Sequence, residues 1–316
     1  MKALIIDRVS PVVEQGLKKN GFDVDIKILP SKEQLKKLVP LYDLLIMRVD
    51  PKIDKELLEA AAGHIRMIGI CSAGTNHIDL ECAKKLGIFV QNAPGINKNA
   101  VAELTIAKMI DLSRMCVQAN NEVQYRGLWN KYKYTGHELK GHTLGIIGLG
   151  NIGKRVAVLA AAFGMKIYAV DPYIPDEDFT KVNACKVDDV KELCKKCDYI
   201  TLHTPINSET KGIISREVVR VMKNGAFLIN CARGGLVDEE AVAEALKDHK
   251  LFGYGADVLQ DELSGNGLSD NAKLNSPLIG MDGFIVSPHI GGSTHEAYDS
   301  IGEFIVNKVV EYFKLK

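Results

Sequence analysis

The pattern Gly148-x-Gly150-x-x-Gly153 is the first group of residues in this sequence whose types and spacing point to chemistry. It stands between an apolar run, 143–147, and an alanine-rich segment, 152–163, whose apolar residues have helical spacing. This arrangement predicts a strand, a tight turn and a helix whose first N–H groups bind a phosphate. Asp171 ends the next apolar run, at the ~20-residue distance at which a carboxylate binds the ribose hydroxyls of NAD and repels the 2′-phosphate of NADP. The motif therefore predicts a dinucleotide site that favours NAD.

Arg233 is a candidate for holding a substrate. It follows the apolar run 226–230 and precedes two glycines, which leave room for a ligand. A guanidinium can grip a carboxylate through two hydrogen bonds and polarise the neighbouring carbonyl oxygen. The alternative is a surface arginine paired with Asp238 or Glu239.

His289 is the candidate acid/base, because a histidine exchanges protons near neutral pH and this one follows the predicted strand 284–287. A carboxylate bonded to the imidazole would stabilise its protonated form and fix its orientation. The residues alone do not choose among Asp257, Asp261 and Glu262 for that role. None of the eight histidines has the spacing of zinc ligands, so we expect no metal site.

Short apolar runs that alternate with helical patterns predict an α/β fold with two doubly wound parallel sheets. In the first domain we expect strands at 3–6, 24–29, 44–47, 67–70 and 89–91, with helices at 11–20, 31–38, 54–62 and 77–86. In the second we expect six strands, at 145–147, 167–170, 199–203, 226–230, 253–257 and 284–287. One long helix, 99–125, should connect the domains, the helix 295–313 should return to the first, and 265–277 should be a loop.

Ligands of such sheets lie beyond the carboxyl ends of the strands. That rule selects a set of residues after four strands of the second domain: His203, Thr204 and Pro205; Asn230, Cys231, Ala232 and Arg233; Asp257; and Pro288 with His289.

The composition excludes several classes of protein. Forty basic and forty acidic residues cancel, and no apolar run is long enough for a membrane span, so we expect neither a nucleic-acid nor a membrane partner. Seven cysteines without a paired pattern indicate the reducing cytoplasm. The pair Cys194-x-x-Cys197 has no second pair to complete a zinc site, which favours a solvated helix face.

These motifs, taken in order, resemble those of the D-isomer-specific 2-hydroxyacid dehydrogenases, and the resemblance covers almost the whole chain. The matching stretches are Gly148–Gly153 with Asp171, Leu202-His-Thr-Pro205, Asn230-Cys-Ala-Arg-Gly-Gly-Leu-Val-Asp238, Asp257-Val258 and Pro288-His-Ile-Gly-Gly-Ser-Thr294. The resemblance implies an NAD-binding Rossmann domain, 98–290, inserted into a flavodoxin-like substrate domain, 1–97 plus 291–316. It implies that each turnover needs closure of the two domains.

The resemblance also implies roles for individual residues. Arg233 becomes the substrate-binding cation, His289 the acid/base and Glu262 its partner, although Leu263 replaces the proline that usually follows the glutamate. The cofactor would be bound by Gly148, Gly150, Asn151, Ile152, Gly153, Asp171, His203, Thr204, Pro205, Cys231, Ala232, Arg233, Asp257, His289, Gly291 and Gly292. Backbone N–H groups of the loop 71–76, with Ser72, Ala73 and Gly74, would bind the substrate carboxylate.

Four further stretches carry a narrower resemblance: Gly74-Thr-Asn-His-Ile-Asp79, Ala102-Glu-Leu104, Arg126-Gly-Leu-Trp-Asn-Lys131 and His289-Ile-Gly-Gly-Ser-Thr-His-Glu-Ala297. Within the family, they resemble the phosphoglycerate dehydrogenases most closely. It implies oxidation of D-3-phosphoglycerate to 3-phosphohydroxypyruvate, as in serine biosynthesis, with Arg48 on the phosphate; the alternative for Arg48 is an ordinary strand-end arginine. The alternative substrates are D-lactate, 2-hydroxyisocaproate, hydroxypyruvate and glyoxylate. A rival of another class is an NAD-sensing corepressor-like scaffold.

The resemblance further implies a homodimer formed through the helix 99–125 and the aromatic segment around Trp129. For that segment, an ordinary surface loop is the alternative.

Overall fold

The computed structural model describes residues 1–262 and 274–315. These residues form two compact units: unit 1 holds residues 1–97 and 292–315, and unit 2 holds 98–262 and 274–291. Gly291 therefore lies in unit 2, and part of the predicted loop 265–277 lies outside the described residues.

Unit 1 is built on a five-stranded parallel sheet of order β2-β1-β3-β4-β5, the flavodoxin-like order that was predicted. Its strands are β1 (Lys2–Ile5), β2 (Asp23–Ile26), β3 (Leu44–Met47), β4 (Met67–Ile70) and β5 (Phe89–Gln91). Its helices are α1 (Pro11–Lys19), α2 (Lys32–Leu38), α3 (Lys55–Ala61), α4 (Leu80–Lys85) and α12 (His295–Phe313), with the 3-10 turn η1 (Val39–Leu41).

The apolar residues of β3 explain why this sheet is covered on both faces. Leu44 and Ile46 pack into one core and Leu45 into another, because successive side chains of a strand point to opposite faces. The first core includes Ile305 of α12, so the last helix packs on this sheet. The helix itself was predicted from the spacing of its apolar residues, and its return to the first domain was expected too.

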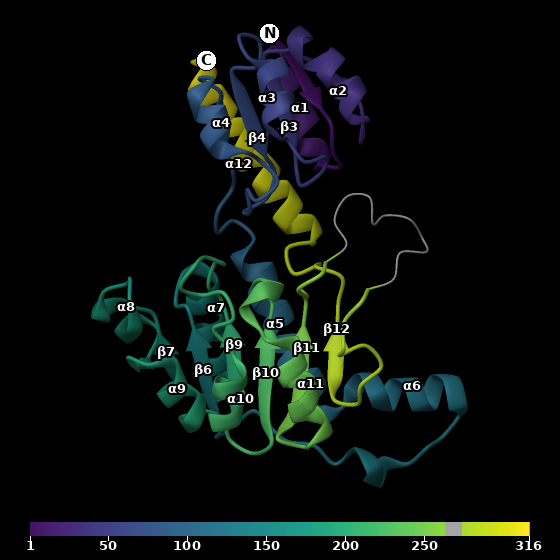
Figure 1. Ribbon diagram of the computed structural model, residues 1–316, viewed down its shortest axis with the longest axis vertical. Coiled ribbons are helices and arrows are strands. Elements are labelled where there is room, and N and C mark those ends of the chain that lie inside the picture. The colour runs from purple at the N-terminus through teal and green to yellow at the C-terminus, as the bar shows by residue number, and fades with distance from the viewer. Residues whose placement is uncertain (263–273, 316) are drawn as a thin grey trace. The chain divides into compact units, whose positions relative to one another are not determined.

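Unit 2 contains a seven-stranded parallel sheet of order β12-β11-β10-β9-β6-β7-β8 (Figure 1). Its strands are β6 (Thr143–Ile147), β7 (Lys166–Val170), β8 (Ala184–Lys186), β9 (Tyr199–Leu202), β10 (Ala226–Asn230), β11 (Leu251–Ala256) and β12 (Phe284–Val286). Its helices are α5 (Lys98–Arg114), α6 (Cys116–Arg126), α7 (Asn151–Ala162), α8 (Asp176–Lys181), α9 (Val190–Lys196), α10 (Arg216–Val221) and α11 (Glu239–Lys247), with 3-10 turns η2 (Lys131–Tyr134) and η3 (Gly234–Leu236). Read from β8, this is the doubly wound Rossmann order with β12 added, which confirms the fold class.

Several details of the predicted elements were wrong. Strand β8 was missed, because it is a three-residue edge strand without an apolar run. The single helix 99–125 is two helices, because Met115 adopts a left-handed backbone with φ 50°. Strand β2 ends at Ile26 rather than residue 29, and α4 begins only at Leu80, where the Asp79 side chain caps it.

The pair Cys194 and Cys197 does not lie on a solvated helix face. Both side chains are fully buried in the core of unit 2, and burial raises the pKa of each thiol to about 12. No helix in residues 1–262 or 274–315 has the length and hydrophobicity needed to cross a membrane.

Candidate active site

The glycine turn after β6 has the geometry of a phosphate cradle. Gly148 has φ +92°, which favours glycine, and a Cβ on Gly153 would lie 2.2 Å from the Gly148 carbonyl oxygen. A Cβ on Gly150 would meet nothing within 4 Å, so this side of the turn is open. Helix α7 begins there without a side-chain cap, and the N–H groups of Asn151 and Ile152 have no acceptor among the described residues. An open turn beside free helix N–H groups fits the pyrophosphate of a dinucleotide.

Asp171 follows β7 and is held against the same turn. One carboxylate oxygen accepts a hydrogen bond from the Leu149 N–H at 2.8 Å, and the other accepts one from the Tyr173 N–H at 3.0 Å. The carboxylate is only partly buried, so its remaining lone pairs are available to ribose hydroxyls.

His203 and Thr204 follow β9, which is the neighbour of β6 in the sheet. The His203 Nε2 lies 3.0 Å from the Thr201 hydroxyl, whereas His203 Nδ1 and the Thr204 hydroxyl are buried without a partner in the described chain. A Cβ on Gly148 would lie 2.6 Å from the Thr204 side chain, so this segment borders the turn. Burial lowers the pKa of His203 to about 3, which leaves a neutral imidazole. Buried polar atoms without partners suit a site completed by a bound ligand.

Arg233 lies beyond β10, in a loop that Asn230 shapes. The fully buried Asn230 side chain accepts a hydrogen bond from the Ala232 N–H at 3.0 Å and donates one to the Arg233 carbonyl at 2.9 Å. The guanidinium donates to the Ala232 carbonyl at 2.6 Å, and no ion pair of Arg233 with Asp238 or Glu239 is present. Its remaining donors are available to an anion.

Cys231 contributes differently from Arg233. Its thiol is buried beside Thr105, and burial raises the pKa of this thiol to about 12. Its side chain is therefore part of the core of unit 2. Pro205, another predicted cofactor residue, accepts a hydrogen bond from the Thr210 hydroxyl at 2.7 Å through its carbonyl.

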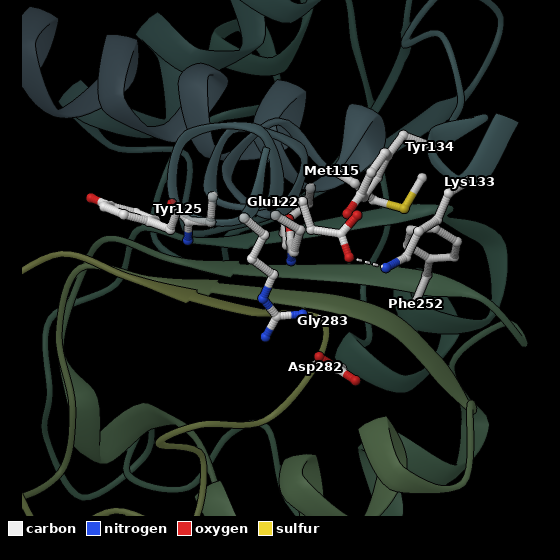
Figure 2. A pocket seen from close by; sticks show the side chains of 12 residues that line it. Met115, Glu122, Tyr125, Lys133, Tyr134, Phe252, Asp282 and Gly283 are labelled. Atoms are coloured by element: carbon white, nitrogen blue, oxygen red, sulfur yellow. Dashed lines mark hydrogen bonds and ion pairs between the residues drawn. The ribbon is translucent and has the colours of Figure 1, made fainter. Parts of the chain in front are cut away.

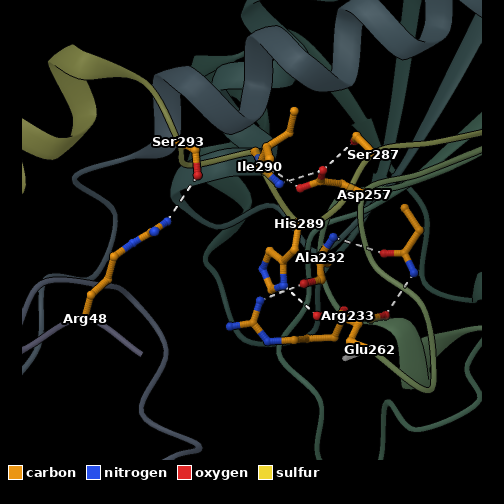
Figure 3. Close-up of polar contacts among 11 residues, drawn as sticks. Arg48, Ala232, Arg233, Asp257, Glu262, Ser287, His289, Ile290 and Ser293 are labelled. Atoms are coloured by element: carbon orange, nitrogen blue, oxygen red, sulfur yellow. Dashed lines mark hydrogen bonds and ion pairs between the residues drawn. The ribbon is translucent and has the colours of Figure 1, made fainter. Parts of the chain in front are cut away.

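Asp257, at the end of β11, braces the segment that carries His289 (Figure 3). Its carboxylate is 2% exposed and accepts hydrogen bonds from the Ser287 hydroxyl at 2.5 Å, the Ile290 N–H at 2.9 Å and the Gly291 N–H at 2.7 Å. The Asp257 carbonyl accepts the His289 N–H at 2.8 Å. These bonds hold His289 in a left-handed backbone, φ 52°.

The imidazole of His289 contacts Glu262, and not Asp257 or Asp261. Its Nδ1 lies 2.6 Å from a Glu262 carboxylate oxygen, and Figure 3 shows this pair together with Arg233. The imidazole is half exposed, which leaves Nε2 accessible. Because β10, β11 and β12 are neighbours, the loops that carry Arg233, Glu262 and His289 leave one edge of the sheet.

Two supporting residues had no recognisable signal in the sequence. Glu239 resembled an ordinary first-turn acid of α11, but it is buried and accepts hydrogen bonds from the Gln260 N–H and the Ser276 hydroxyl, both at 2.6 Å. It thereby holds the segment that precedes Glu262. Lys108 of α5 is buried near Cys231 and Asp257, and burial lowers its pKa.

Unit 1 has its own cluster at the switch point between β1 and β3. The buried carboxylate of Asp7 accepts hydrogen bonds from the N–H groups of Arg48, Val49 and Asp50. The Arg48 guanidinium donates to the Ser293 hydroxyl at 3.1 Å and stacks 4.6 Å from the centre of the Tyr298 ring. Arg48 is thus fixed in position on the surface of unit 1.

The predicted carboxylate-binding loop follows β4. The Ser72 hydroxyl donates to the Arg48 carbonyl at 2.9 Å, and the Ala73 carbonyl accepts a hydrogen bond from the Asn92 side chain at 2.6 Å. The N–H groups of Ala73 and Gly74 donate to no acceptor in the described part of the chain. Gly292, which was predicted to touch the cofactor, lies in unit 1, where a Cβ would meet the Asn97 side chain at 2.6 Å.

The described residues contain no group of three or more His, Cys, Asp or Glu side chains that could hold a metal ion. The glycine turn, Asp171 and the unpaired atoms after β9 instead fit a dinucleotide. This fold and site define an NAD-binding α/β protein of two units.

The comparisons identify the family. Residues 106–291 match the family model described as "D-isomer specific 2-hydroxyacid dehydrogenase, NAD binding domain". The chain belongs to the D-isomer specific 2-hydroxyacid dehydrogenase family, and the matched region is its NAD-binding domain.

Three similar proteins span a range of substrates. D-3-phosphoglycerate dehydrogenase of Methanocaldococcus jannaschii is 38% identical over 98% of this chain, but the chain spans only 57% of that relative. Hydroxypyruvate reductase of Thermotoga maritima is 37% identical, with 88% of this chain and 87% of the relative covered. The structure of D-lactate dehydrogenase from Aquifex aeolicus, complexed with NAD and lactic acid, is 30% identical with a TM-score of 0.85, over 99% of this chain and 95% of that one.

Proposed function

We propose that this chain is an NAD-dependent dehydrogenase that interconverts a D-2-hydroxy acid and its 2-keto acid. The contact between Glu262 and His289 Nδ1 carries the proposal, because it leaves the other imidazole nitrogen to exchange a proton. The names of the relatives described above support the same reaction class. Unit 2 would bind NAD and unit 1 would supply substrate contacts.

The residues act as follows in this proposal. In oxidation, His289 Nε2 accepts the proton of the substrate hydroxyl, and Glu262 stabilises the imidazolium. Arg233 binds the carboxylate and polarises the oxygen on C2. In reduction, the same imidazolium returns its proton to that oxygen. The bound cofactor would accept the hydride as NAD⁺ in oxidation and donate it as NADH in reduction.

The proposed substrate is D-3-phosphoglycerate, with Arg48 on its phosphate. The named phosphoglycerate dehydrogenases among the relatives and the fixed position of Arg48 support this choice. A guanidinium suits a phosphate because it donates two parallel hydrogen bonds.

The test follows NADH absorbance with 3-phosphohydroxypyruvate, hydroxypyruvate, glyoxylate, pyruvate and 2-ketoisocaproate. We expect the highest kcat/KM with the phosphorylated acid. Arg48→Gln should lower that value by roughly 10- to 100-fold, the effect of losing a hydrogen bond to a charged group, and should spare hydroxypyruvate. The control is Arg66→Gln. Like Arg48, Arg66 stacks on an aromatic ring of α12, with its guanidinium carbon 4.6 Å from the centre of the Phe313 ring, but the proposal gives it no contact with the substrate.

Two outcomes would contradict parts of this proposal. No NADH oxidation with any of the five acids would refute the enzyme and would favour an NAD-sensing scaffold. Equal losses on phosphorylated and unphosphorylated acids in Arg48→Gln would refute the phosphate role and would leave lactate, 2-hydroxyisocaproate, hydroxypyruvate or glyoxylate as the substrate class.

A homodimer in the cytoplasm is also proposed. Helix α6 buries none of its residues, and the exposed rings of Tyr125, Trp129 and Tyr132 follow one another in the chain. Tyr125 also lines a groove of about 710 Å³ (Figure 2). Its other lining residues are Leu112, Met115, Gln118, Asn121, Glu122, Arg126, Lys133, Tyr134, Phe252, Asp282 and Gly283. A surface helix without buried residues and with exposed aromatic rings suits burial by a second copy of the chain. Seven free thiols suit a reducing compartment.

A further inference from the structure

A side-chain bridge crosses the end of β6 in unit 2. The Tyr173 hydroxyl donates a hydrogen bond to the Glu209 carboxylate. Tyr173 follows β7 and Glu209 follows β9, and β6 lies between these two strands in the sheet. The bridge therefore spans the edge from which the glycine turn and α7 emerge.

The bridge is not part of a packed core. The Tyr173 side chain is 73% exposed, and Glu209 is exposed too. An exposed tyrosine gains little from apolar burial here, so packing does not explain its position.

Hydrogen bonds from their backbone N–H groups fix both residues of the bridge. The Tyr173 N–H donates to Asp171, which also binds the Leu149 N–H of the glycine turn. On the other side, the Asn207 side chain accepts the N–H groups of Glu209 and Thr210 at 2.9 and 3.0 Å. Glu209 is therefore positioned by its loop, in the same way that Asp171 is positioned by the turn.

Two carboxylates consequently act on one phenol. The pKa of Tyr173 is raised first by its hydrogen bond to Glu209, then by the charge of Glu209, and further by burial and by the charge of Asp171. The hydrogen bonds from the Tyr173 hydroxyl to Glu209 and from the Tyr173 N–H to Asp171 bring both carboxylates to the end of the cradle where Asp171 would bind the ribose. A 2′-phosphate placed there would be repelled by both.

We propose that Glu209, held by Tyr173, is a second specificity-determining acid that acts with Asp171 to exclude NADP from the adenosine end of the site. This inference rests on the proposed binding of NAD by unit 2. It assigns Glu209 a charge effect on the 2′-phosphate and assigns Tyr173 the positioning of that charge.

The test is isothermal titration calorimetry with NAD⁺ and NADP⁺, in the full chain and in an Asp171→Asn background that brings NADP⁺ affinity into a measurable range. Glu209→Gln should tighten NADP⁺ binding by roughly 3- to 10-fold, the effect of removing one charge a few Å away in largely aqueous surroundings. NAD⁺ affinity should change less than about 2-fold, because the ribose hydroxyls are uncharged. Tyr173→Phe should have a smaller effect in the same direction, because the Glu209 carboxylate keeps its charge but loses the hydrogen bond that positions it.

The control is Glu311→Gln, which removes an exposed acid paired with Lys308 in unit 1. A charge effect must also weaken with salt, so the change in NADP⁺ affinity caused by Glu209→Gln should shrink at 0.5 M NaCl, where the Debye length is about 4 Å. An unchanged ratio of NADP⁺ to NAD⁺ affinity, or a change that persists in salt, would overturn the proposal. Failure of the unsubstituted chain to bind NAD⁺ would instead refute the proposed function.

Discussion

At the scale of single residues, His289 shows how backbone and side chain are fixed together. Its left-handed backbone is an uncommon conformation for a residue other than glycine, and it persists because Asp257 holds the segment at several points. Glu262 then fixes the ring from the other side of the loop. The imidazole is therefore preorganised before any ligand arrives.

This arrangement predicts the effect of removing the imidazole. His289→Asn should lower kcat by roughly 10²- to 10⁴-fold, the usual contribution of a general acid/base, and should weaken NADH binding far less. Asparagine tolerates the left-handed backbone, so the fold should be unaffected. Glu262→Gln should cost less, because the proton-exchanging nitrogen remains. The measurements are steady-state kinetics and NADH fluorescence titration.

The matched control is His249→Asn, because His249 is exposed and also has a positive φ, 55°. It should change neither kcat nor NADH affinity. Turnover that survives in His289→Asn would rule out the acid/base role of this residue.

At the scale of elements, the strand-end rule selected residues that the structure places in loops at one edge of the sheet of unit 2. Strand β10 was predicted to the residue, because its five buried positions are continuous, and Arg233 followed from its end. The edge strand β8 and the break at Met115 were not predictable from apolar spacing, since neither changes it. The roles of Asn230 and Glu239 could not be predicted for another reason. Their hydrogen-bond partners, which include Arg233 and Ser276, depend on the course of loops, and residue spacing does not determine that course.

Asp198 ties three strands of unit 2 together at their starts. Its carboxylate accepts the Thr143 N–H at 2.9 Å, the Thr143 hydroxyl at 2.6 Å and the Lys223 ammonium at 2.7 Å, and its carbonyl accepts the Phe227 N–H at 2.9 Å. Burial alone would raise the pKa of Asp198, but the bonds from Lys223 and Thr143 outweigh it and lower the pKa to about 2. A carboxyl with a depressed pKa stabilises the fold above its unfolded pKa, and this contribution is lost as the pH falls toward 2.

Asp198→Asn should therefore reduce the free energy of unfolding by about 2 kcal/mol at pH 7. The difference from the unsubstituted chain should narrow below about pH 4 and vanish near pH 2. Differential scanning calorimetry between pH 7 and about pH 2.5 measures this difference in the free energy of unfolding. Asp248→Asn, which removes an exposed acid at the end of α11, is the control and should change the free energy of unfolding at pH 7 far less. A deficit that is constant with pH would mean that packing, and not charge, explains the loss.

At the scale of the whole molecule, the doubly wound class of both sheets was predictable, because strands alternate with helices along the sequence. Both sheets also have a switch point, and the polar clusters lie there: Asp7 and Arg48 in unit 1, and the glycine turn with His203 in unit 2. Sequence periodicity predicted the order of most elements, whereas only the structure shows that α6, which belongs to the segment predicted to form a homodimer, lies at the surface. The apolar spacing had joined α6 to α5 as one helix, yet none of the residues of α6 is buried.

That surface gives the proposed dimer an optical reporter, because Trp129 is the only tryptophan in the chain. Its side chain is 84% exposed in the single chain, beside Tyr125 and Tyr132 at 82% and 80%. If two copies associate through this segment, the indole leaves water. Its emission maximum should then move to shorter wavelength as concentration rises from nanomolar to micromolar, in step with a doubled mass in sedimentation velocity.

Replacing Tyr125 and Tyr132 by Ser should keep the emission at long wavelength and the chain monomeric, because such rings supply much of an interface's binding energy. Leu41→Ser, which removes an exposed side chain of unit 1, should leave the transition in place. A chain that sediments as a monomer at micromolar concentration, with emission unchanged by dilution, would contradict the homodimer.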